Sequence, residues 1–96
     1  MVDYNYNDLS YSERIGIIED YYYYYEFGDV IRDAKKMFSD EDEVWDYLKG
    51  YINDIIYGNF SKPLHSCIKD KYDKEMLFWD LRRYVKGKYL EICGDC

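Results

Sequence analysis

The sequence has no threonine or glutamine, and its 96 residues include only one proline and one histidine. Because breakers of regular structure are few, long segments are available for helices, and this argues against a many-stranded sandwich. Long hydrophobic runs are also missing: no segment reaches the roughly 18 consecutive apolar residues of a membrane helix. The opening residues 1–8 are polar and acidic rather than typical of a signal peptide, so we expect a cytoplasmic protein.

Aromatic residues, in contrast, are abundant. With 14 tyrosines and an aromatic content of 21%, the chain is too rich in rings to be a disordered acidic tail, although its net charge is -7. A chain of 96 residues can bury one modest core. We therefore predict a single acidic helical domain that spans residues 1–96.

The acidic charge is concentrated in the first part of the chain. Residues 1–60 carry 14 acidic and five basic side chains, whereas residues 61–96 carry six acidic and eight basic ones. Direct binding to nucleic acid requires a field of lysine and arginine side chains, which the acidic part lacks. A charged partner should therefore be basic, such as a nucleic-acid-binding protein, and we expect no membrane contact.

Hydrophobic spacing predicts a mainly α-helical protein, a compact bundle of four to five short helices. The first helix should be capped by Ser10 or Ser12 and stopped by Gly28. The second should cover residues 29–38. Its predicted buried stripe consists of Val30, Ile31, Ala34, Met37 and Phe38.

Start and stop signals predict two more helices. Ser39 supplies a hydroxyl cap, and the acidic run at residues 40–43 that follows it favours a helix over residues 40–57, with Gly58 at its end. Asp73 can cap the last helix, and Gly87 would stop it.

The last residues before the C-terminus have a different pattern. Residues 88–93 alternate loosely between polar and apolar side chains, which predicts a short strand. A lone strand needs a partner for its backbone groups, and the segment that would pair with it is residues 2–6. The predicted fold class therefore includes the option of a small terminal β-strand pair.

Five consecutive tyrosines occupy residues 21–25. On a helix they cover more than one turn, so at least two must point away from the core. Half-buried packing explains such a run, because tyrosine tolerates partial exposure. Tyrosine is also enriched at protein interfaces, so Tyr22, Tyr23 and Tyr24 are alternatively a contact patch.

Few residues offer chemistry for catalysis, and we predict no enzyme. His65 and Cys67 are neighbours in one loop, whereas a nucleophile and its base normally come from distant segments. No glycine-rich phosphate loop is present. Four soft ligands nevertheless suggest a tetrahedral zinc site as an alternative to free thiols, and no other cofactor is expected. The candidate zinc ligands are His65, Cys67, Cys93 and Cys96.

The carboxylates permit two interpretations. A solvated acidic face is ordinary for a small soluble protein. Alternatively, carboxylates three or four residues apart on a helix stand about 5–6 Å apart, so that they could replace nucleic-acid phosphates in a cationic channel. The candidate partner-binding residues combine these acids with the tyrosine patch: Asp20, Tyr22, Tyr23, Tyr24, Glu26, Asp29, Asp33, Asp40, Glu41, Asp42, Glu43 and Asp46.

Residues 40–92 resemble the C-terminal part of the ArdA-type antirestriction proteins. The resemblance consists of an acidic, aromatic helix, then a helix that opens with Asp and Glu and closes on Asp-Leu, then a short segment ending in Glu-Ile. These features fall on residues 40–57, on Asp73, Glu75, Asp80 and Leu81, and on Tyr89, Glu91 and Ile92. The resemblance implies an acidic DNA mimic encoded by a phage or plasmid, similar in appearance to small anti-CRISPR proteins.

These observations lead to one hypothesis and one alternative. The hypothesis is a counter-defence inhibitor that blocks the nucleic-acid channel of a host nuclease or CRISPR effector. The alternative is a zinc-stabilised helical adaptor that binds another protein through the tyrosine-rich face.

Overall fold

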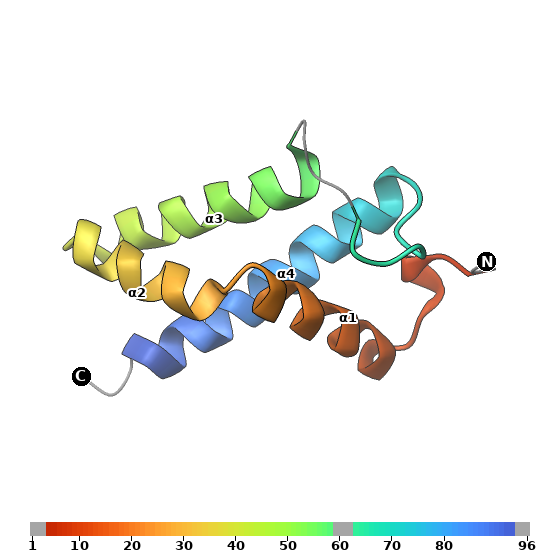
Figure 1. Ribbon diagram of the computed structural model, residues 1–96, viewed down its shortest axis with the longest axis horizontal. Coiled ribbons are helices and arrows are strands. Elements are labelled where there is room, and N and C mark those ends of the chain that lie inside the picture. The colour runs from red at the N-terminus through yellow and green to blue at the C-terminus, as the bar shows by residue number, and fades with distance from the viewer. Residues whose placement is uncertain (1–3, 59–62, 94–96) are drawn as a thin grey trace.

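Four α-helices follow a short 3-10 turn in the computed structural model, whose described residues are 4–58 and 63–93. The turn, η1, covers Tyr6–Asp8, and the helices are α1 (Tyr11–Tyr24), α2 (Phe27–Met37), α3 (Glu41–Tyr57) and α4 (Lys71–Cys93). Figure 1 shows them in one elongated body, with overall dimensions of 45 × 29 × 19 Å. The prediction of a mainly helical fold is confirmed.

Polar side chains define where three of the helices begin. Ser10 and Glu13 form a reciprocal capping box at the start of α1. Asp40 accepts a 2.9 Å hydrogen bond from the backbone N–H of Asp42 at the start of α3. At α4 the cap is Asp70, whose carboxylate accepts bonds from the second and third residues of the helix. Asp73, the predicted cap, instead lies within the first turn.

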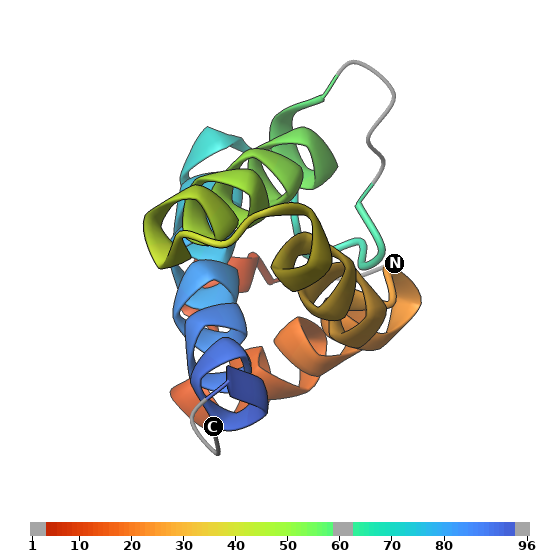
Figure 2. The same cartoon turned by 90° about the vertical axis from the view of Figure 1, so that its left-hand side faces the viewer.

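The longest helix, α4, is the one that every other element contacts. Figures 1 and 2 show α1, α2 and α3 arranged around it, with α2 between the other two. A three-residue turn reverses the chain between α2 and α3, so these helices run antiparallel. None of the helices in the described part of the chain is long and apolar enough to cross a membrane.

One hydrophobic core involves all four helices and η1. Its fully buried members include Tyr6 of η1, Ile18 of α1, Ile31 of α2, Leu48 of α3 and Leu81 of α4. Each burial removes apolar surface from water and contributes about 1.5–3 kcal/mol for a side chain of this size. The helices hold together because each contributes an apolar face to this common core.

The connection between α1 and α2 is a sharp corner rather than a glycine stop. Glu26 adopts a left-handed conformation with φ 52° and ψ 47°, and it precedes the first residue of α2. Gly28 lies inside α2, so the prediction that it ends the first helix is wrong. Met37, predicted to be buried, is 55% exposed at the end of α2.

Helix α4 also continues beyond its predicted end. Gly87 lies within it, and residues 88–93 complete the helix, so the predicted strand is wrong. The reason is visible in the packing: Val85 and Tyr89 are buried and Ile92 packs against the same core, which continues the helical period. The described residues contain no strand, and part of the proposed pairing segment, residues 2–3, lies outside them.

A buried carboxylate joins the beginning of the chain to α4. Asp73 is 0% exposed, and its oxygens accept hydrogen bonds from the backbone N–H groups of Asn7, Lys69 and Asp70 at 3.1, 3.0 and 3.2 Å. Burial disfavours the charged carboxylate, but these donors outweigh that effect and lower the pKa of Asp73. The segment before α1 is therefore fixed to the start of α4.

Candidate functional site

The strongest candidate among the predicted residues is the acidic tip, which we define as five carboxylates at the start of α3. All five side chains are exposed. Figure 2 shows this end of the molecule, with the turn between α2 and α3 toward the viewer. The members of the acidic tip are Asp40, Glu41, Asp42, Glu43 and Asp46.

Helix α3 provides a fixed support for the acidic tip. Asp40 caps the helix, while Val44 and Leu48, one and two turns in, are buried in the core. The positive end of the helix dipole favours negative charge at this position. The carboxylates are thus attached to an ordered backbone, so that a partner would not need to order the segment on binding.

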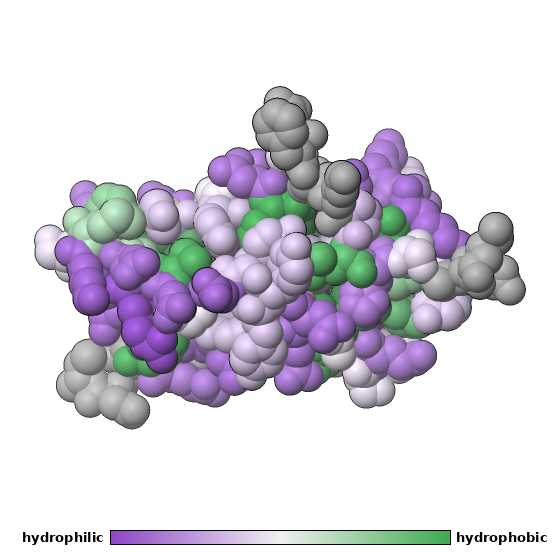
Figure 3. Space-filling view, in the orientation of Figure 1, coloured by the Kyte–Doolittle hydropathy of each residue, from purple (hydrophilic) through white to green (hydrophobic). Residues whose placement is uncertain are grey.

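Hydrophobic side chains border the acidic tip. Met37 is 55% exposed and Tyr47 is 40% exposed, and the ring centroids of Tyr47 and Phe38 are 5.8 Å apart. Figure 3 shows strongly hydrophilic side chains over α2 and a small hydrophobic area at the α2–α3 end. Sequence reasoning did not assign these three residues to the site, because the apolar stripe of residues 29–38 placed Met37 and Phe38 in the core.

Cations lie near the acidic tip, but they neutralise little of it. Lys49 Nζ is 3.1 Å from Asp46 Oδ1, one turn further along α3. Within residues 4–58 and 63–93, Asp46 is the one member of the acidic tip that forms an ion pair. Lys86 of α4 is stacked over Trp45, with its Nζ 4.7 Å from the ring centroid.

The remaining predicted acids are distributed over other elements. Asp29 of α2 is paired with Arg32 at 3.2 Å, and Asp33 is exposed on the same helix. Asp20 of α1 accepts a 2.8 Å hydrogen bond from Nε2 of His65, in the loop before α4. Glu26 is exposed at the corner between α1 and α2. The predicted acids thus occupy three helices and one corner.

The tyrosine run divides between core and surface. Tyr22 is only 7% exposed and packs against Phe27 and Tyr84, with ring centroids 5.7 and 5.3 Å away. Its prediction as a contact residue is therefore wrong. Tyr23 and Tyr24 are 65% and 67% exposed, and they remain available for contact.

The structure separates the candidate zinc ligands. His65 and Cys67 precede α4, whereas Cys93 is its last residue, and 23 helical residues span roughly 33 Å. Cys96 and the side chain of Cys93 lie outside the described residues. Among the described residues, no group of three or more His, Cys, Asp or Glu side chains is placed to hold a metal ion. Within the described residues His65 and Cys67 are therefore not part of a metal-binding group, and the other two predicted ligands are not described.

The loop before α4 also gives little support for nucleophilic chemistry. Cys67 is 3% exposed, and burial raises the pKa of its thiol. A thiol that stays protonated at neutral pH is a poor nucleophile. His65 is oriented toward Asp20 of α1, so it links this loop to α1.

Comparisons with protein-family models, with curated proteins and with solved structures found no match to this chain.

Proposed function

We propose that this protein is a stoichiometric inhibitor that binds a basic groove of a nucleic-acid-binding protein through the acidic tip. The observation that carries the proposal is the exposure of five carboxylates on two successive turns of one anchored helix. Side chains three or four residues apart on a helix stand about 5–6 Å apart. A groove lined with lysine and arginine would accept such a row in place of phosphates.

The hydrophobic border of the acidic tip supports a protein partner in particular. Exposed Met37 and Tyr47 offer apolar contact area beside the charges. Charge would guide the partner to this end of the molecule, and the apolar side chains would slow its dissociation.

The class of partner follows from the resemblance to ArdA-type antirestriction proteins. That resemblance favours a phage- or plasmid-encoded counter-defence protein, whose target in the host cytoplasm is a nuclease or a CRISPR effector. In this proposal the protein carries out no reaction and requires no cofactor, because occupying the channel is sufficient to inhibit the target.

The proposal is tested by capture of a host nuclease on the immobilised protein, followed by competition with duplex DNA. We expect DNA to displace the nuclease, and capture to weaken sharply between about 50 and 200 mM salt, by analogy with phosphate contacts. A nuclease that holds duplex DNA and this protein at the same time would contradict the proposal.

A charge-matched pair of variants locates the contact. The double variant Asp42→Lys and Glu43→Lys should abolish capture. The control, Asp54→Lys with Glu75→Lys, makes the same change in net charge at exposed positions outside the acidic tip and should retain it. Equal loss in both variants would show that overall charge, rather than the acidic tip, determines binding.

A second candidate function rests on Tyr23 and Tyr24, which are 65% and 67% exposed side by side on α1. They favour a protein-binding adaptor whose interface is led by aromatic contacts. Binding of this kind should change little with salt and should be lost in the double variant Tyr23→Ser and Tyr24→Ser. The salt titration therefore distinguishes the two functions.

A further inference from the structure

A cleft of about 230 Å³ lies between α1 and α4, on a different part of the molecule from the acidic tip. For comparison, an apolar cavity of about 150 Å³ holds one benzene molecule. The α1–α4 cleft is therefore large enough for a single ring with a short side arm. It opens to solvent, so a ligand could enter without a change of fold.

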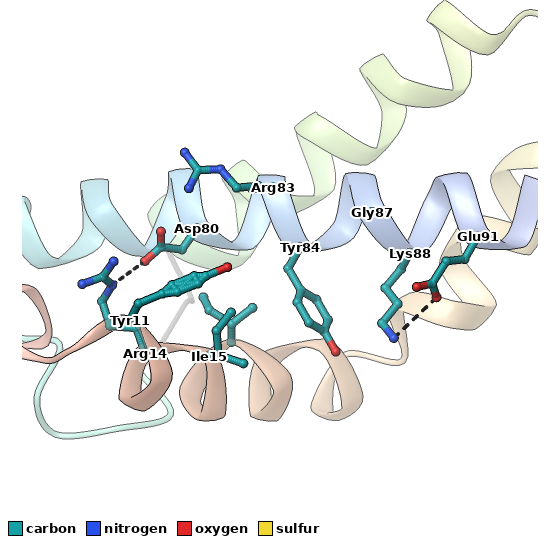
Figure 4. Close-up of a pocket in the computed structure, with 10 residues that line it drawn as sticks. Tyr11, Arg14, Ile15, Asp80, Arg83, Tyr84, Gly87, Lys88 and Glu91 are labelled. Atoms are coloured by element: carbon teal, nitrogen blue, oxygen red, sulfur yellow. Dashed lines mark hydrogen bonds and ion pairs between the residues drawn. The ribbon is translucent and has the colours of Figure 1, made fainter. Parts of the chain in front are cut away.

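The interior of the α1–α4 cleft is apolar. Ile15 and Ile18 of α1 form one wall, and Tyr84 of α4 faces them. Figure 4 shows the rings of Tyr11 and Tyr84 on either side of Ile15. Gly87 lines the cleft as well, and a Cβ atom there would meet no other atom within 4 Å. The lack of a side chain at Gly87 therefore leaves space open at one end.

The charged groups around the α1–α4 cleft favour an anion. Asp80 is already engaged, because it accepts hydrogen bonds from Tyr6 Oη at 2.7 Å and from Arg14 Nε at 3.0 Å. Lys88 Nζ is 3.6 Å from Glu91 Oε2. Arg83 forms no ion pair or hydrogen bond with any described residue. The lining of the cleft thus contains three cations and two carboxylates. Arg14 and Lys88 are paired with Asp80 and Glu91, so Arg83 is the cation left over.

We propose that the α1–α4 cleft binds a small apolar monocarboxylate. Its ring would lie against Ile15, Ile18 and Tyr84, and its carboxylate would lie at the rim. In Figure 4 the Arg83 side chain extends from α4 on the side away from α1. The side chain is exposed, and in this proposal it turns toward the rim to reach the carboxylate. Lys88, at the same rim, would be the second cation in reach. A cationic ligand is disfavoured because both carboxylates of the cleft already have partners.

The ligand class is tested by NMR titration of the ¹⁵N-labelled protein with phenylpropionate. We expect a dissociation constant in the millimolar range, which is usual for a ligand of this size, and shifts of backbone amides that line the cleft. The neutral analogue phenylpropionamide and the cation phenethylammonium should bind at least about tenfold more weakly, since each loses the charge-assisted bond. The proposal is overturned if the amide binds as well as the acid, or if cleft amides do not shift.

A substitution of Arg83, compared with the same substitution at Arg82, tests which cation binds the carboxylate. Arg83→Gln should weaken phenylpropionate binding about tenfold. Arg82→Gln is the matched control, because Arg82 loses the same charge but is stacked over Phe78 and Trp79, at 5.3 and 4.6 Å from their ring centroids. Equal weakening by both would overturn the assignment to Arg83.

Gly87→Leu fills the open end of the cleft and should abolish binding without unfolding α4, because leucine favours a helix and the position is open. Its melting temperature, measured alongside, should equal or exceed that of the wild type. Unchanged binding by the folded Gly87→Leu variant would also overturn the proposal. Arg83 is exposed, so the Arg83→Gln result remains interpretable if Gly87→Leu is unstable.

Discussion

Tyr6 and Asp80 are 74 residues apart in the chain, yet the Tyr6 hydroxyl donates a 2.7 Å hydrogen bond to Asp80 Oδ2. Arg14 donates to the same oxygen at 3.0 Å and to the carbonyl of Leu9 at 2.9 Å. Tyr6 itself is 0% exposed, and burial followed by the bond to Asp80 raises the pKa of its phenol. This cluster closes the N-terminal segment over the middle of α4.

Replacing Tyr6 by phenylalanine should lower the free energy of unfolding by about 1.5–3 kcal/mol, the usual contribution of a hydrogen bond to a charged group. The ring would remain in the core, so the loss reports the hydroxyl alone. Urea denaturation followed by circular dichroism measures the change. Tyr4→Phe, at a position that is 48% exposed, is the control and should be nearly neutral. Equal effects would contradict a special role for Tyr6.

Asp73→Asn should lower the free energy of unfolding by about 2–4 kcal/mol, because an amide replaces the buried acceptor of three backbone N–H groups. Asp33→Asn, at an exposed site, should change it little.

The Asp73 carboxylate should also account for part of the loss of folding stability at low pH. Folding lowers the pKa of Asp73, so its stabilisation is fully present above the unfolded pKa of about 3.9 and is lost as the pH falls below that value. Denaturation measured between about pH 2 and 6 should show a steeper fall in wild type than in Asp73→Asn. Parallel curves for the two proteins would show that another group is responsible.

Glu26→Gly should raise the free energy of unfolding by about 0.5–1 kcal/mol. The left-handed conformation at φ 52° strains a residue with a Cβ atom, and glycine relieves that strain at some cost in chain entropy. Asp33→Gly, inside α2, is the opposite control and should lower stability by about 1 kcal/mol. A lower melting temperature for Glu26→Gly than for wild type would argue against strain at this corner.

Two substitutions at Asp40 distinguish the capping role of this side chain from the effect of its negative charge. Asp40→Ala should lower the free energy of unfolding by about 1 kcal/mol, whereas Asp40→Asn keeps a capping oxygen and should be nearly neutral. Both variants remove one negative charge. Thermal denaturation compares the stabilities of the two variants. A similar loss of stability in both would assign the effect to the helix dipole rather than to the cap.

Local signals in the sequence were sufficient to place the starts of α1 and α3 and the end of α3. Ser10 and Gly58 mark two of these boundaries as predicted, whereas the cap of α3 is Asp40, one residue after the predicted cap Ser39. Gly28 and Gly87 did not end helices as predicted. A glycine inside a helix costs only about 1 kcal/mol of stability, and the packing of neighbouring residues can exceed that cost. The corner instead falls on Glu26, and nothing in the residue type indicates a left-handed conformation.

The end of α4 could have been predicted from the spacing alone. Val85, Tyr89 and Ile92 continue the helical period, but the alternation of residues 88–93 was interpreted as a strand. The placement of Tyr6 and Asp73 in the interior could not have been predicted, since it depends on segments that meet only in the folded chain.

For the candidate site, the sequence indicated the acidic tip because helix-start carboxylates are exposed by local geometry. The spacing from Ile15 and Ile18 does place Tyr22 on the apolar face of the first helix, and Tyr22 was assigned to the contact patch only because the tyrosine run was treated as one unit. The α1–α4 cleft was missed entirely. It combines residues from the first and last helices, and no short motif joins them.

The bonds from Tyr6, Asn7 and Arg14 to α4 span 66 to 74 residues. A ribosome adding about 5–20 residues per second needs roughly 3 to 15 s to make the intervening chain. Throughout that time the N-terminal segment lacks the carboxylates to which it bonds, so this domain cannot finish folding until Asp73 and Asp80 have been synthesised. Messages truncated before the codon for Asp73 would yield products that lack both anchoring carboxylates, which quality-control proteases should remove.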